Sequence, residues 1–320
     1  MNKTIRTLLA SACLCALAVP AAAQYPTKPI RLIIPLPAGG TIDSAARLMA
    51  QPMSAALGQP IVIENRVGAD GSIAATAVAR SAADGYTLLL ASNGQMAALP
   101  HLRKNPPYDV LKDFTPITSV NRYNFVVFAN ATLPVGSIAE LIAHAKANPG
   151  QIEYGTGTST GVIAAAAFQS LTGTRMLQVP YKGDPAAIAD LAQGRIKLLF
   201  STPVGVAGFL KEGRIKALAT LLPRRSPAMP EVPTMAEAGL PSFAISSWGG
   251  LFGPAGLPAE VTERIAREAN AALKRPEVLE GLNRLNVVAQ GSTPEEFTAF
   301  VREQHAAWGR AVKDAGIQPD

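Results

Sequence analysis

Short apolar segments alternate with segments of helical periodicity along most of the chain, and this alternation limits the folds that it can adopt. Ile30–Leu36 is typical of a buried strand, and after a glycine turn Ala46, Met49, Met53 and Leu57 recur at helical spacing. The further predicted strands are Ile61–Glu64, Tyr86–Ala91, Phe125–Ala129, Glu153–Gly155, Met176–Pro180, Lys197–Phe200, Ile215–Leu221 and Ser246–Gly253. The further predicted helices are Ser72–Ser81, Ser137–Ala147, Val162–Leu171, Pro185–Gln193, Gly205–Lys211, Pro258–Leu273 and Pro294–Ala315.

Strands that alternate with helices predict an α/β protein whose mainly parallel sheets are covered by helices on both faces. Two such units in one chain indicate two lobes joined by a hinge. We expect the chain to cross between them near Ser119–Asn124 and to return near Ser246–Gly250. Residues 24–123 plus 246–320 would then form lobe 1 and residues 124–245 lobe 2, with a ligand cleft between them.

The N-terminus has the three parts of a cleavable secretory signal. Lys3 and Arg6 precede an apolar stretch, Leu8–Val19, and the small residues Ala21–Ala23 follow. We therefore expect residues 1–23 to be removed after Ala23 and the mature protein to work in the periplasm. Because Cys13 and Cys15 both lie in this segment, the mature chain should contain no disulfide and no cysteine-based metal site.

The charge and the histidines exclude several classes of function. The formal charge is +6, or 6 − 2 = +4 without Lys3 and Arg6, and the basic residues are spread along the chain without interleaved aromatic residues. This pattern predicts no nucleic-acid partner. His101, His144 and His305 are far apart, so we expect no metal ion, and no motif predicts another cofactor. No heptad pattern is present, and we expect a monomer.

The turn after the first predicted strand is the first candidate ligand site. Glycines at this place allow backbone N–H groups to approach a ligand, and the start of the following helix favours an anion. No Gly-Lys-Ser/Thr sequence follows, which excludes a nucleotide-binding P-loop. An ordinary turn in which Asp43 caps the helix is the alternative. The candidate residues are Leu36, Pro37, Ala38, Gly39, Gly40, Thr41 and Asp43.

A second candidate turn, Gly155–Gly161, is rich in glycine and hydroxyl groups and also lies between a strand and a helix. Its glycine spacing does not match a dinucleotide-binding fingerprint. Three further strands are followed by segments that would face the same cleft, because the carboxyl ends of parallel strands meet at one edge. These segments are Ser92–Gly94, Tyr181–Asp184 and Ser201–Pro203. The candidates from the turn and from these segments are Ser92, Asn93, Thr158, Ser159, Thr160, Ser201 and Thr202.

A serine hydrolase is an alternative, because Gly157–Gly161 also satisfies the G-x-S-x-G pattern of a nucleophile elbow. Asp184 or Asp190 could supply the acid, and His305 is the only histidine after Ser159. That histidine falls in the middle of a predicted helix, near its apolar face, whereas the catalytic histidine of such enzymes lies on a loop. The pattern therefore favours binding over hydrolysis.

Several blocks of the sequence together resemble the periplasmic solute receptors of tripartite tricarboxylate transporters, also called the Bug family. The likeness runs from Tyr25 to about Ile317, with the blocks in the same order and at the same spacing. The blocks that carry it are Tyr25–Asp43, Leu57–Arg66, Asp84–Leu90, Val179–Gly183, Val232–Pro241 and Gly249–Gly256.

This resemblance implies a type II periplasmic-binding-protein fold and a small organic carboxylate held by the first turn of each lobe. It carries ligand contacts over to Pro37–Gly40, Asp43 and Thr158–Thr160. It also implies membrane permease subunits as partners and no catalysis, although docking on a membrane kinase for sensing is an alternative. The second turn is shorter than is usual in the family, and Ser201 stands where an Asp is common. Loss of that acid disfavours a ligand with a free amine.

Overall fold

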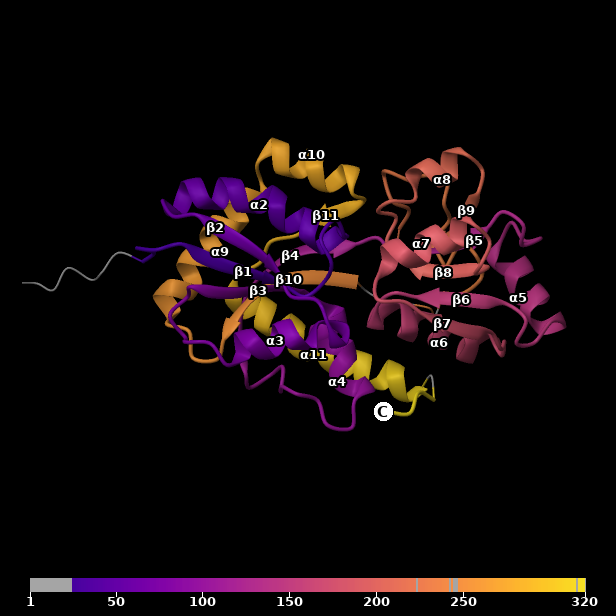
Figure 1. The fold of residues 1–320 in the computed structure, drawn as a ribbon, viewed down its shortest axis with the longest axis horizontal. Helices are drawn as coiled ribbons and strands as arrows, with labels where there is room; N and C mark the ends of the chain where they lie inside the picture. The colour runs from indigo at the N-terminus through magenta and orange to yellow at the C-terminus, as the bar shows by residue number, and fades with distance from the viewer. Residues whose placement is uncertain (1–24, 223, 242, 244–246, 315, 320) are drawn as a thin grey trace, which may run out of the picture.

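The computed structural model describes residues 25–222, 224–241, 243, 247–314 and 316–319. The predicted signal peptide and its cleavage after Ala23 therefore lie outside the described residues, as does Ser246 at the predicted return. The described chain folds into two lobes side by side, each built on its own sheet (Figure 1). This confirms the predicted α/β architecture.

The first sheet has the strand order β11-β4-β10-β3-β1-β2. Its strands are β1 (Ile30–Ile34), β2 (Ile61–Asn65), β3 (Thr87–Ser92), β4 (Phe114–Tyr123), β10 (Ser247–Pro254) and β11 (Val287–Ala289). The helices of this lobe are α2 (Thr41–Leu57), η2 (Ala69–Gly71), α3 (Ser72–Ala79), η3 (Gly94–Ala98), α4 (Leu99–Leu102), α9 (Ala259–Leu273), α10 (Pro276–Arg284) and α11 (Pro294–Asp314).

The second sheet has the strand order β7-β6-β8-β5-β9. Its strands are β5 (Val126–Asn130), β6 (Glu153–Thr156), β7 (Leu177–Pro180), β8 (Leu198–Ser201) and β9 (Ile215–Thr220). The helices of this lobe are α5 (Ile138–Ala147), α6 (Ser159–Thr172), α7 (Asp184–Ala192) and α8 (Ala207–Lys211).

Both sheets are mixed, although most of their strands run in one direction. From the pairings, β1 to β4 share a direction that β10 and β11 oppose, and β6 to β9 share a direction that β5 opposes. The reason is connectivity. Strands β5 and β10 each arrive from the other lobe, so each enters its sheet at the edge where its neighbours end. The ends of β1, β3, β6 and β8 consequently face the space between the lobes.

Helices cover both faces of the first sheet, which explains why its strands are apolar on both sides. Ile30, Leu32 and Ile34 pack against α2, α9 and α10, whereas Ile33 belongs to a second core with α3 and α11 (Figure 1). That second core continues into the other lobe through Phe125 and its neighbours. One hydrophobic core therefore extends across both lobes.

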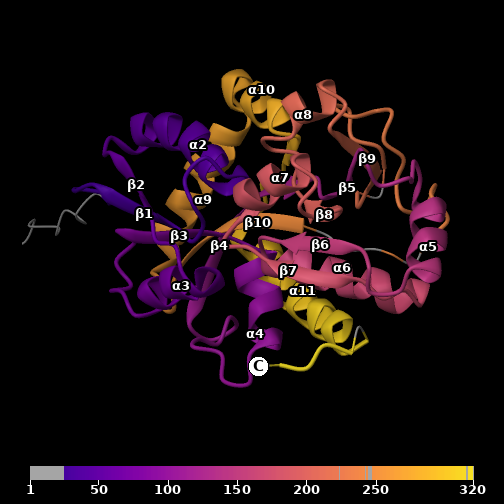
Figure 2. The same cartoon turned by 45° about the vertical axis from the view of Figure 1, so that its right-hand side comes forward.

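The C-terminal helices pack back on the first lobe, and α11 also reaches the second lobe beside α6 (Figure 2). Ser170 on α6 donates a hydrogen bond to the carbonyl of Asp314, 3.1 Å away. Helix α11 begins with a capping box, because Thr293 Oγ1 accepts from Glu296 N and Glu296 Oε2 accepts from Thr293 N. No helix in the described ranges has the length and apolar character needed to cross a bilayer.

Several elements were not predicted from the sequence. Strand β4 contains Pro116 and three polar residues, Thr118, Ser119 and Asn121, which interrupt the apolar pattern expected of a buried strand. All three polar residues are nevertheless buried. The short elements η3, α4, α10 and β11 were also missed. Trp248 on β10 is fully buried against Phe297 in the core.

Gly250 on β10 provides a test of this packing, because a Cβ atom there would lie only 2.7 Å from Cε1 of the buried Phe297 ring. Gly250→Ala should lower the free energy of unfolding by about 1–3 kcal/mol, since the core cannot absorb the added methyl group without strain. Urea unfolding followed by circular dichroism measures this. Gly208→Ala on α8 is the control, because open space surrounds that position. Equal stability of the two variants would contradict the packing described here.

Candidate functional site

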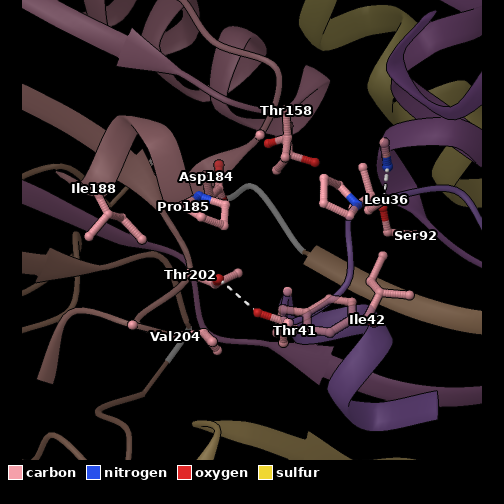
Figure 3. Close-up of a pocket in the computed structure, with 18 of the residues that line it drawn as sticks. Leu36, Thr41, Ile42, Ser92, Thr158, Asp184, Pro185, Ile188, Thr202 and Val204 are labelled. Carbon is pink, nitrogen blue, oxygen red and sulfur yellow. Dashed lines mark hydrogen bonds between the residues drawn. The ribbon is translucent and has the colours of Figure 1, made fainter. Parts of the chain in front are cut away.

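A cavity of about 350 Å³ lies between the two lobes, at the ends of the strands that face each other. Figure 3 shows residues of the second lobe, including Asp184 and Ile188, opposite residues of the first lobe, including Leu36 and Ile42. Several segments distant in the sequence thus meet at one place, as the topology requires. We treat this cavity as the candidate ligand site.

The turn between β1 and α2 forms one wall of the cavity. Helix α2 begins at Thr41 with Gly40 at its N-cap, and Gly39 has a φ of +80° that favours glycine. The first N–H groups of a helix have no acceptor within it, so those of Thr41 and Ile42 are available to a ligand. The predicted residues Leu36, Pro37, Gly39, Gly40 and Thr41 line the cavity.

Asp43 supports this turn and does not line the cavity, and Ala38 is also absent from the lining. The alternative that Asp43 caps the helix is wrong, because Gly40 is the cap. The buried Asp43 carboxylate accepts hydrogen bonds from Gly39 N (2.9 Å), Arg47 (3.0 Å) and Asn65 (3.0 Å). Burial alone would raise the pKa of Asp43, but these donors together lower it below its ordinary value.

The turn between β6 and α6 forms the opposite wall. Helix α6 begins at Ser159, three residues earlier than predicted, because the Thr158 hydroxyl caps it by accepting from Gly161 N at 3.2 Å. Thr158 and Thr160 line the cavity. Ser159 does not, and its buried Oγ has no hydrogen-bond partner among the described residues.

Asn93 joins the two walls from behind the cavity lining. Its Oδ1 accepts from Trp248 N (3.1 Å) and from the hydroxyl of Ser247 (3.1 Å). A backbone N–H can only donate, so this contact fixes the orientation of the amide. Asn93 Nδ2 therefore faces Thr160 Oγ1, at 2.8 Å, and donates to it across the lobes. Of the predicted pair at this strand end, only Ser92 lines the cavity.

The hydroxyl groups at the cavity retain protons for a ligand. The oxygens of Thr158 and Thr160 accept bonds from the protein, and no described residue accepts from either hydroxyl. Thr41 and Thr202 share one bond of 2.8 Å across the cavity, which leaves one of their two protons free (Figure 3). Ser92 is committed, because it donates to Gln95 Oε1. The uncommitted groups are donors, which suits a ligand that accepts hydrogen bonds.

Asp184 supplies an acidic group to the cavity; the sequence placed its segment at the cleft but named Asp184 itself only as a possible member of a hydrolase triad. It begins α7 and lines the cavity beside Thr202, whereas Ser201 does not line it. Burial raises the pKa of Asp184 to about 6, against the opposing effect of hydrogen bonds from Ser201 and from the Thr202 backbone. The carboxylate that Ser201 lacks, at a position where an Asp is common in the family, is therefore supplied nearby by Asp184.

The remaining wall is largely apolar and was not predicted. Ile42, Phe125, Ile188, Val204 and Phe209 contribute to it. The sequence did not mark these residues as part of a ligand site, because apolar residues at such places usually belong to a hydrophobic core. Among the described lining residues there is no Lys, Arg or His. The described residues also contain no group of three side chains able to hold a metal ion.

The hydrolase geometry is not formed in the described structure. Ser159 Oγ makes no hydrogen bond, so no base is placed to take its proton. The candidate base His305 lies on α11 and packs its ring on that of His101, with the centroids 4.4 Å apart. Asp190 binds Tyr181 and Arg195. Ser159 is therefore joined by a hydrogen bond neither to His305 nor to either candidate acid, Asp184 or Asp190.

Removal of the Asp43 carboxylate tests its role under the first turn. Asp43→Ala should lower the free energy of unfolding by about 2–4 kcal/mol, because Gly39 N and Asn65 lose a buried charged acceptor. Urea unfolding measures the loss. Glu280→Ala is the control, since its pair with Arg284 is exposed and should contribute under about 0.5 kcal/mol. Losses of similar size would refute the supporting role of Asp43.

The raised pKa of Asp184 predicts a pH dependence. Because the folded protein binds this proton more tightly than the unfolded chain, the contribution of Asp184 to stability is full below about pH 4 and is lost as pH rises through 6. Asp184→Asn should therefore gain stability relative to the wild type between pH 5 and pH 7.5. Urea unfolding of both proteins at both pH values measures this difference. A constant difference would show that Asp184 titrates normally.

Comparison with known proteins places the chain in a family. The sequence profile described as "Tripartite tricarboxylate transporter family receptor" matches residues 45–317. Protein BugT of Bordetella pertussis is 35% identical over 94% of this chain and 94% of its own length. A protein encoded in the tcbD-tcbE intergenic region of Pseudomonas sp. strain P51 is 32% identical, over 90% of this chain and 86% of its own length.

Solved structures agree in fold. Periplasmic binding protein BugD is 30% identical with a TM-score of 0.85, covering 92% of this chain and 100% of that one. An R. palustris protein with adipate is 34% identical with a TM-score of 0.88 and the same coverage. MatC from Rhodopseudomonas palustris with bound malate is 29% identical with a TM-score of 0.84, covering 90% of this chain and 100% of that one. The chain therefore belongs to the tripartite tricarboxylate transporter family of receptors, whose solved members are two-lobed periplasmic binding proteins.

Proposed function

We propose that this protein captures a small organic carboxylate between its lobes in the periplasm and delivers it to the membrane permease of a tripartite tricarboxylate transporter. In this proposal the protein is a monomer, performs no catalysis and needs no cofactor. Residues 1–23 would direct export and would be cleaved off after it. Residues 24–123 plus 246–320 would form one lobe and residues 124–245 the other.

One observation carries the proposal: both lobes offer free hydrogen-bond donors to the cavity. The first turn of α2 offers backbone N–H groups, and Thr158 and Thr160 offer hydroxyl protons from the opposite wall. A carboxylate accepts several hydrogen bonds and is further favoured by the positive end of a helix dipole. Closure around it would remove water and strengthen these bonds.

Two relatives with bound acids support the same class of ligand. The R. palustris relative was solved with adipate and MatC with malate, and both share the fold of this chain. The unengaged Ser159 hydroxyl argues against hydrolysis, because a serine nucleophile needs an adjacent base. Binding without chemistry therefore accounts for the polar groups at the cavity.

A variant that fills the cavity tests the proposal directly. Ala189 lies on α7 and lines the cavity, so Ala189→Trp should occupy ligand space and weaken the binding of any carboxylate at least ten-fold. A thermal-shift screen of the protein from Gln24 onward against organic acids, sugars and esters identifies a ligand by mass action. Isothermal titration calorimetry then measures the loss of affinity.

Ala186→Trp is the matched control, because Ala186 is exposed on the same helix and does not line the cavity. It should bind like the wild type. No stabilisation by any carboxylate would overturn the proposed function. Equal weakening by both tryptophans would show that the ligand binds elsewhere than in this cavity.

A further inference from the structure

The described cavity lining carries an acidic side chain but no basic one, and this imbalance limits the charge that a ligand can carry. Asp184 is the only acidic residue of the described lining, and that lining contains no basic residue. The donors of α2 and α6 complement one carboxylate group. A second carboxylate would find no cation among the described lining residues, and it would enter a site that already holds a negative charge.

Helix α7 does not provide a second anion site, although its start borders the cavity. Asp184 is its first residue and Pro185 its second, so the first turn carries a carboxylate and lacks one N–H group. A helix N-terminus attracts anions through its free N–H groups and positive dipole, and here the Asp184 carboxylate offsets that attraction. The α7 end of the cavity therefore disfavours an anion.

The Asp184 carboxylate is also poorly placed to bind an amine directly. Its Oδ1 is buried without a described hydrogen-bond partner. This oxygen packs so closely against the main chain of Gly157 that a Cβ atom added to Gly157 would lie 2.5 Å from it. A ligand ammonium could not reach this oxygen without displacing the turn that holds Thr158. The negative charge still acts over several ångströms, because a buried charge is weakly screened.

The other part of the cavity suits a hydrocarbon. Ile42 from the first lobe faces Ile188 and Val204 from the second (Figure 3). Phe125 and Phe209 also contribute to the wall. Burial of methylene or aromatic carbon against such a wall is favourable, whereas burial of an unpaired charge is costly. The wall thus matches the body of a ligand that carries its charge at one end only.

From these contacts we propose that the cavity selects a monocarboxylic acid with an apolar aliphatic or aromatic body, and that Asp184 disfavours a second carboxylate. This inference rests on the proposed function, since it assumes that a carboxylate binds between the lobes. It distinguishes this chain from the relatives solved with adipate and malate, which hold acids with two carboxylates.

Calorimetric titration with three six-carbon acids tests the inference. Hexanoate, adipate and norleucine have the same chain length and differ by an end carboxylate or an amine. Hexanoate should bind at least ten-fold more tightly than either of the others at pH 7.5. Phenylacetate against 1,4-phenylenediacetate is the aromatic counterpart, and the acid with one carboxylate should again bind more tightly.

Asp184→Asn isolates the contribution of the charge. The ratio of the adipate to the hexanoate dissociation constant should fall at least three-fold in this variant. Asp190→Asn is the control, because it removes the same charge from the same helix at a residue outside the cavity lining, and it should leave the ratio unchanged. The melting temperature of each unliganded variant establishes that it is folded.

The outcomes separate this inference from the proposed function. If adipate binds as tightly as hexanoate in the wild type, the selectivity is wrong while carboxylate capture stands. If norleucine binds more tightly than hexanoate, Asp184 recognises an amine and the inference is overturned. An unchanged ratio in Asp184→Asn refutes the role of that residue. If no acid of either series binds, the inference fails, and the proposed function fails with it when the thermal-shift screen also finds no carboxylate that stabilises the protein.

Discussion

The hydrogen bonds of Asn93 hold together the parts of the molecule on which the site depends. This fully buried amide lies at the end of β3 and bonds both to Thr160 in the other lobe and to the backbone of Trp248 on the returning strand. An amide buried at this place without partners would be costly, so these bonds favour the relative positions of the lobes and β10 that the structure shows. The orientation of Thr160, and hence of its free proton, follows from this constraint.

Much of the fold could be predicted because its strands are short, apolar and separated by clear turns. The prediction failed where local pattern and tertiary burial disagree. Strand β4 is an interior strand of the first sheet although Thr118, Ser119 and Asn121 are polar. The Thr118 hydroxyl and the Ser119 backbone N–H both find a distant partner in Ser292. Such long-range compensation leaves no trace in a local window of sequence.

Of the site, only the two turns that carry its backbone donors could be predicted from the sequence. Glycines and hydroxyls after a strand indicated both turns, but the pattern could not tell which side chains face the cavity and which support it from beneath. Asp43 and Ser159 belong to the second group because the helices begin at Thr41 and Ser159, which turns these side chains away from the lining. The apolar wall and the position of Asp184 arise from the approach of two lobes, which no single segment encodes.

The hydroxyl bond between Thr41 and Thr202 has a consequence for how long a ligand stays bound. It joins the lobes across the cavity, and opening exchanges it for bonds to water, so its net contribution is about 1 kcal/mol. A contact of that size changes the ratio of open to closed molecules by about five-fold. It can bias an empty protein toward closure but cannot hold it shut. The residence time is consequently set by the ligand's own contacts, and an emptied receptor reopens readily for the next molecule.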